Sequence, residues 1–145
     1  MDLGHVRRQL FDGFSFREFL AVTLIVGLLA SIAVPLFLDQ RKKSHDAEAK
    51  NSLNSVAATI VTYVAKSESL PTVTVSDSAV SFGDGTVATL DPGVVLGALT
   101  GTADTWCIDD THPHGDRAKV KGYKYSSTGD VADDKVEEGQ CVTPE

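Results

Sequence analysis

The sequence lacks the residue combinations on which most redox, catalytic and nucleic-acid-binding sites depend. Its two cysteines, Cys107 and Cys141, form no CxxC pair, which argues against a thiol redox site. No nucleophile, general base and orienting acid stand out as a group, so we predict no catalytic site and no cofactor. Basic residues are few, with 13 Lys and Arg against 20 Asp and Glu, and this balance argues against a broad nucleic-acid-binding face.

Familiar metal-binding spacings are missing as well. The stretch richest in ligands, Asp109 to Asp116, holds His112, His114 and three carboxylates, but their order matches no zinc or calcium pattern. A His-Pro-His sequence in an exposed turn needs no metal, so we favour a solvated loop. The acids near the C-terminus also lack a twelve-residue calcium loop; these are Asp130, Asp133, Asp134, Glu137 and Glu138. We therefore predict no metal site.

Charge is absent from the twenty positions between Glu18 and Asp39. A helix of this length, at about 1.5 Å per residue, extends roughly 30 Å and matches the core of a bilayer. No second apolar run of this kind follows, so we expect a single membrane span. The Glu18 carboxylate at the edge of the span is energetically costly, so we expect it to have a function. Alternatively, Arg17 and Glu18 simply mark the aqueous edge of an anchor.

The residues at the start of this run resemble the N-terminal region of type IV pilins. Gly13 is followed by Phe14, a glutamate stands four residues further on at Glu18, and Pro35 follows that glutamate by seventeen residues. A glycine, a phenylalanine and a glutamate that lead directly into an apolar helix form a specific signal. The family usually has Lys or Arg before the glycine, where this chain has Asp12.

In that family a membrane-embedded prepilin peptidase cuts after the glycine and usually methylates the new amino terminus. The resemblance therefore implies cleavage between Gly13 and Phe14, methylation of the Phe14 amine, and pairing of Glu18 with that amine in a neighbouring subunit. It also implies a chain that is stored in the cell membrane as a single-pass protein. An assembly platform and motor would then polymerise it with its own copies into an extracellular filament.

Three other interpretations remain open. A pseudopilin of a type II secretion-like machine would share the fold, whereas a membrane-anchored extracellular binding domain would never polymerise. A conventional secretory signal is the third, because Ser31-Ile32-Ala33 resembles a small-residue cleavage site. Against that third interpretation, the apolar run continues past this site to Leu38.

The sequence predicts an α+β, pilin-like fold, in which a long N-terminal helix packs on a small antiparallel β-sheet domain. We expect a leader, a membrane-spanning or polymerisation half of the helix, an amphipathic half of the helix, and a β-rich C-terminal domain; these cover residues 1–13, 14–38, 39–67 and 68–145. Pro35 lacks an amide donor and clashes with the preceding turn, so a kink or an unwound segment is expected near residues 31–35.

The amphipathic half of the helix shows a clear apolar face. Its apolar residues follow one another at steps of 4, 3, 1, 3 and 4, and they are Ala49, Leu53, Val56, Ala57, Ile60 and Val64. The domain that follows must cover this face. Short alternating segments predict its strands, at residues 72–75, 79–82, 86–90, 105–108 and 118–125, with a hairpin turn at Gly83-Asp84-Gly85.

The cysteine pair is expected to form one disulfide, because a domain held outside the membrane lies in an oxidising compartment. Closing a loop of about 35 residues would stabilise the fold by roughly 3–4 kcal/mol in the chain-entropy model. Two buried thiols or a redox pair are the alternatives. Pilins of the family end in a comparable disulfide-closed region, so Cys141 would hold the C-terminal tail against the strand that contains Cys107.

Overall fold

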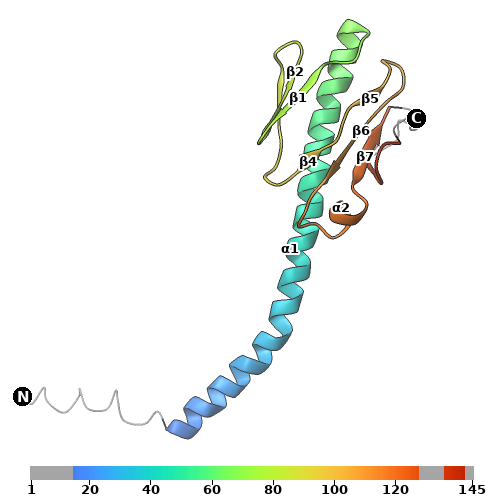
Figure 1. The fold of residues 1–145 in the computed structure, drawn as a ribbon. Helices are drawn as coiled ribbons and strands as arrows, with labels where there is room; N and C mark the ends of the chain where they lie inside the picture. Colours follow the sequence, from blue (N-terminus) through green and yellow to red (C-terminus); the bar gives the residue numbers. More distant parts are fainter. Residues whose placement is uncertain (1–14, 128–135, 143–145) are drawn as a thin grey trace, which may run out of the picture. The chain divides into compact units, whose positions relative to one another are not determined.

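The computed structural model describes residues 15–127 and 136–142. Its elements, in chain order, are α1 (Phe16–Ser67), β1 (Val73–Ser76), β2 (Ala79–Phe82), β3 (Val87–Thr89), β4 (Val95–Leu96), β5 (Thr100–Gly101), β6 (Trp106–Thr111), α2 (Arg117–Val120), β7 (Tyr123–Ser126) and β8 (Val136–Glu138) (Figure 1). The contacts divide the chain into two compact units, and the division falls between Asp39 and Gln40. The predicted α+β architecture, with a long N-terminal helix and small antiparallel sheets, is confirmed.

Helix α1 contains Pro35 without interruption. Of the kink or unwound segment that we expected near residues 31–35, the unwound segment is wrong, because every residue there is helical. Proline removes only one donor, the one that would have bonded the carbonyl of Ser31, and the other hydrogen bonds of the helix persist on either side. The helix ends at Ser67, where Glu68 takes a φ of 50° and its amide donates to the carbonyl of Val64 at 2.9 Å.

Two antiparallel sheets belong to the second unit. The first has the strand order β1-β2-β3, and the second has the order β4-β6-β7-β8, with β5 also paired to β6. The predicted hairpin joins β2 to β3: Gly85 has a φ of 85°, and the Thr86 amide donates to Asp84 Oδ1 at 2.9 Å. The strands predicted at 72–75, 79–82, 86–90 and 105–108 correspond to β1, β2, β3 and β6. The short strands β4, β5 and β8 were not predicted.

The predicted strand over 118–125 is wrong in its first half, where residues 117–120 form α2. Gly122 separates the helix from β7 with a φ of 71°, which breaks the alternating backbone that a strand needs. Asp46 of α1 supplies the second reason, since its buried carboxylate accepts the backbone amides of Arg117 and Ala118 at 3.0–3.2 Å. This carboxylate satisfies donors that begin α2 and therefore favours a helical turn at this position.

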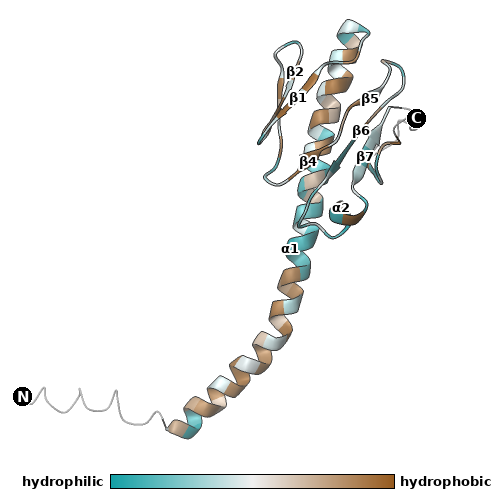
Figure 2. Ribbon diagram, viewed as in Figure 1, coloured by the Kyte–Doolittle hydropathy of each residue, from teal (hydrophilic) through white to brown (hydrophobic). Residues whose placement is uncertain are grey.

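The core of the second unit lies between α1 and the two sheets. Five residues of the predicted face of α1 are completely buried, namely Ala49, Leu53, Val56, Ala57 and Ile60, while Val64 is partly buried at the edge. They pack in one cluster with strand residues that include Val80, Phe82, Trp106, Ile108 and Tyr123. In Figure 2 hydrophilic and hydrophobic residues alternate along this half of α1, whereas hydrophobic residues predominate along the other half. The predicted core face is confirmed.

Candidate functional site

The first turn of α1 is capped by its own glutamate. The Ser15 amide donates to Glu18 Oε2 at 3.1 Å, and the Glu18 amide donates to the Ser15 carbonyl at 2.8 Å. This is the glutamate half of a capping box, in which the third helical residue reaches back to the residue before the helix. Sequence reasoning assigned Glu18 to assembly and missed this bond, although the Ser-x-x-Glu pattern of Ser15 to Glu18 indicates it.

The bond gives the Glu18 carboxylate a partner within its own chain. Amide donors at a helix start favour an anion by about 0.3–1 kcal/mol, so the carboxylate is held at the start of α1 by its own chain. The predicted cleavage site between Gly13 and Phe14 lies outside the described residues. The pairing of Glu18 with a Phe14 amine therefore stays a prediction.

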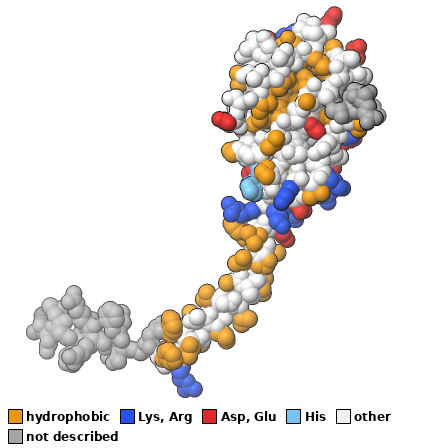
Figure 3. Space-filling model, in the orientation of Figure 1, with side chains coloured by type: hydrophobic (Ala, Val, Ile, Leu, Met, Phe, Trp, Pro, Cys, Tyr) orange, Lys and Arg blue, Asp and Glu red, His pale blue; other side chains and the backbone are white. Residues whose placement is uncertain are grey.

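The apolar half of α1 is exposed along its whole length. All residues from 15 to 43 are exposed, and the large apolar side chains range from 49% exposed at Val22 to 74% at Phe16. Figure 3 shows these hydrophobic side chains following the helix. The most apolar part of this helix has no buried residue, and α1 is long and apolar enough to cross a membrane.

The two hydroxyl side chains within the uncharged run form hydrogen bonds with carbonyl groups of their own helix. Thr23 Oγ1 donates to the Phe19 carbonyl at 2.7 Å, and Ser31 Oγ donates to the Leu28 carbonyl at 2.7 Å. Hydroxyls that bond back to their own helix need no water and no partner. The segment can therefore enter an apolar environment without leaving these groups unpaired.

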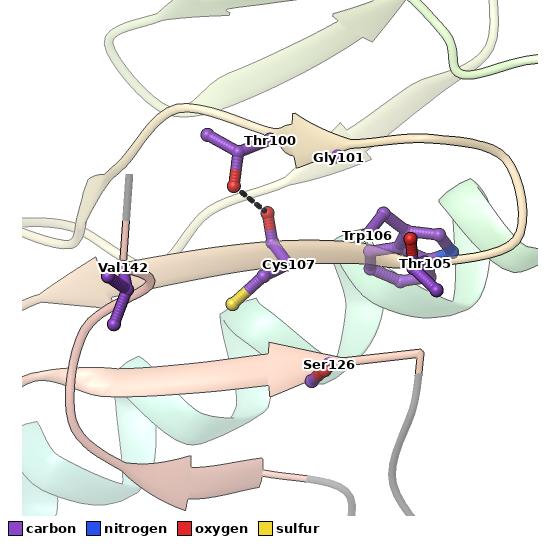
Figure 4. Close-up of a pocket in the computed structure, with 7 residues that line it drawn as sticks. All are labelled: Thr100, Gly101, Thr105, Trp106, Cys107, Ser126 and Val142. Carbon is purple, nitrogen blue, oxygen red and sulfur yellow. Dashed lines mark hydrogen bonds between the residues drawn. The ribbon is translucent and has the colours of Figure 1, made fainter. Parts of the chain in front are cut away.

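The two cysteines form the expected disulfide, with their Cα atoms 5.8 Å apart. It joins β6 to the segment after β8, so the alternative of two buried free thiols is excluded. Beside it lies an open pocket of about 220 Å³ (Figure 4), lined by Thr100, Gly101, Thr105, Trp106, Cys107, Ser126 and Val142. The Thr100 hydroxyl donates to the Cys107 carbonyl at 3.4 Å. None of these lining residues carries a charge, so the pocket offers no group for acid or base chemistry.

The loop from Asp109 to Asp116 is less solvated than predicted. His114 is exposed, but His112 is 1% exposed, so the solvated interpretation is wrong for His112. The His112 ring stacks on that of His45 of α1, with ring centroids 4.5 Å apart. Its Nε2 atom lies 3.7 Å from Glu48 Oε2. Sequence reasoning missed His45 and Glu48, whose i, i+3 spacing puts both on one face of α1.

Three other acids of this region have partners within the protein. Asp109 Oδ2 accepts the Cys141 amide at 3.1 Å, and Glu138 forms ion pairs with Arg117 and with Lys121, the latter at 3.3 Å. Glu137 lies 3.7 Å from Lys124. The tail acids Asp130, Asp133 and Asp134 lie outside the described residues. These contacts leave Glu137 and Glu138 paired with cations of the protein itself.

Asp110 is the exception, because its carboxylate is 1% exposed and neither oxygen has a hydrogen-bond partner among the described residues. Burial, followed by the nearby Asp109 carboxylate, raises the pKa of Asp110 to about 8. The acid is therefore largely protonated at neutral pH, and its contribution to the stability of the folded domain is lost as pH rises from about 4 to 8.

No protein-family model matches the chain, and no curated protein matches it significantly.

Proposed function

We propose that this chain is a prepilin that is cleaved after Gly13 and then polymerises through α1 into a type IV pilus filament. The observation that supports this most is the first half of α1, a continuous apolar helix with no covered face, whose first turn is capped by Glu18. Exposed apolar surface of this extent marks a membrane or protein contact. A membrane accommodates it before assembly, and neighbouring copies of α1 accommodate it in the filament.

The position of Glu18 supports the assembly step of this proposal. Cleavage after Gly13 would place a new ammonium on Phe14, directly before the Ser15 amide that already donates to Glu18. In a filament, an incoming ammonium from another chain would meet a carboxylate that is held in place and needs little reorganisation. Two opposite charges that enter an apolar core as a pair cost far less than either charge alone.

The second unit supplies the outward-facing part of such a subunit. Its core is closed on the sheet side by β-strands and on the other side by the buried face of α1, and its C-terminal segment is fixed by the disulfide. A domain held together in this way suits an extracellular location, where disulfides persist. The proposal therefore assigns self-association to the apolar half of α1 and surface display to the domain.

The N-terminus of the protein sheared from cell surfaces tests the proposal directly. Mass spectrometry of the N-terminal peptide should find a chain that begins at Phe14, with or without a methyl group on its amine. A chain that begins at Val34 would identify a conventional secreted domain. A chain that begins at Met1 and stays in the membrane fraction would identify a plain anchor. Either of these two results would overturn the filament proposal.

A further inference from the structure

Three metal-ligating side chains from two distant segments meet at one point of the second unit. His45 and Glu48 project from α1, and His112 lies just after the end of β6. Glu48 Oε2 is 2.8 Å from His45 Nδ1 and 3.7 Å from His112 Nε2, and the three ligand atoms lie within 4.8 Å of one another. This is the one such group among the residues that the structure describes.

We propose that His45, Glu48 and His112 bind a zinc ion, with water as the fourth ligand. Two imidazoles and one carboxylate form a donor set that zinc accepts. Tetrahedral zinc with bonds of about 2.0–2.1 Å holds its ligand atoms roughly 3.3 Å apart. The separations of Glu48 Oε2 from His45 Nδ1 and from His112 Nε2, 2.8 Å and 3.7 Å, lie on either side of that value. The proposal is independent of whether the chain polymerises.

His112 is the fixed ligand of the three. Its ring is buried against Gly93, where a Cβ atom would lie 2.9 Å from Nε2, so only glycine allows this approach. His112 Nε2 lies 3.2 Å from the Pro92 carbonyl, which can only accept a hydrogen bond. His112 Nδ1 accepts the His114 amide at 3.2 Å. These neighbours assign the proton of the metal-free ring to Nε2.

Zinc binding at Nε2 displaces its proton to Nδ1, so His112 no longer donates to the Pro92 carbonyl, and the protonated Nδ1 no longer accepts the His114 amide. Loss of the hydrogen bond from the His114 amide to His112 Nδ1 therefore indicates that zinc is bound. His45 also moves: an imidazole binds a metal in the plane of its ring, so the ring of His45 turns out of its stack on His112. The His45 ring has room to rotate in this way, because His45 is only partly buried.

Zinc titration of the untagged full chain in detergent micelles, in competition with a chromogenic chelator, tests the proposal. We expect one zinc ion per chain. Loss of a residue that merely orients a ligand costs about 10–100-fold in metal affinity, so Glu48→Gln and His45→Gln should each weaken binding at least tenfold. His114→Gln is the matched control, since its ring centroid lies 5.9 Å from that of His45 and 6.0 Å from that of His112, and its zinc affinity should stay unchanged.

The backbone amide of His114 gives a second readout that does not depend on a buried substitution. Its NMR signal should shift on addition of zinc to the wild-type chain and should stay in place in Glu48→Gln at the same zinc concentration. Three results would each overturn the proposal: no zinc binding by the wild-type chain, wild-type affinity in Glu48→Gln, or an equal loss of affinity in His114→Gln.

Discussion

Replacing Glu18 by glutamine removes its charge but keeps an oxygen that can accept the Ser15 amide. Glutamine completes a capping box as glutamate does, so Glu18→Gln should preserve the helix start, whereas Glu18→Ala loses both the charge and the cap. Loss of a cap costs about 0.5–2 kcal/mol. Loss of one partner from a buried ion pair costs about 3–5 kcal/mol, because the other charge stays buried alone. The two substitutions therefore separate the two tasks of this side chain.

Both variants should insert into the membrane normally, because each shortens or neutralises a side chain at the edge of an unchanged apolar segment. If the buried pair controls assembly, both should lose filaments to a similar extent, since 3–5 kcal/mol corresponds to a factor of about 10²–10⁴ in the association constant. The assay compares the amount of protein in the membrane fraction with the amount in filaments sheared from the cell surface.

Normal filaments from Glu18→Gln would refute the charge argument and would leave Glu18 with capping alone. Arg17→Gln is a matched control, because it removes a neighbouring charge that takes no part in the capping bond. It should leave the quantity of filaments unchanged. Loss of filaments in Arg17→Gln and Glu18→Gln alike would point to a general need for charge at the start of the helix.

The remaining predictions concern the stability of the second unit, measured by thermal and denaturant unfolding of the full chain in detergent. Cys107→Ser should lower the free energy of unfolding by about 3–4 kcal/mol, and a reductant should have the same effect on the wild-type chain but none on the variant. The pKa of Asp110 is raised on folding, so folding retains a proton, and wild-type stability should fall as pH rises from about 4 to 8. Asp110→Asn should remove this fall, and an unchanged pH profile would contradict the assignment. Leu53→Ala should cost about 2–5 kcal/mol because Leu53 is fully buried, whereas the matched Leu29→Ala, at a side chain 63% exposed, should leave domain unfolding unaltered.

Local patterns predicted most of the fold. The spacing of Ala49, Leu53 and Val56 was enough to identify the buried face of α1, because the helical repeat places residues at these spacings on the same face. The glycines around Asp84 similarly required a turn between β2 and β3. The disulfide followed from the number of cysteines and the expected compartment. Each of these features depends on residues close in sequence or on a pair with no competitor.

The features that were missed depend on contacts between distant residues. Helix α2 is favoured by Asp46, which lies 71 residues before Arg117, and no pattern within residues 117–120 indicates that partner. His112 is buried because α1 and the Pro92-Gly93 turn close around it, whereas its own neighbours in sequence read as an exposed turn. Glu18 differs from both, because its capping partner Ser15 is local and was readable from the sequence.

Helix α1 combines two surfaces that have opposite requirements. Up to Asp39 it is apolar on every side, and a helix of this kind needs partners on every side, which one small domain cannot provide. After Gln40 one face is apolar and the opposite face is charged, and the domain of the same chain covers the apolar face except at its edge, where Val64 is partly buried. Substitutions in the second half should therefore act on folding, and those in the first half on the membrane and on neighbouring copies. This separation is what a subunit needs if it is to fold first, wait in a membrane and assemble afterwards.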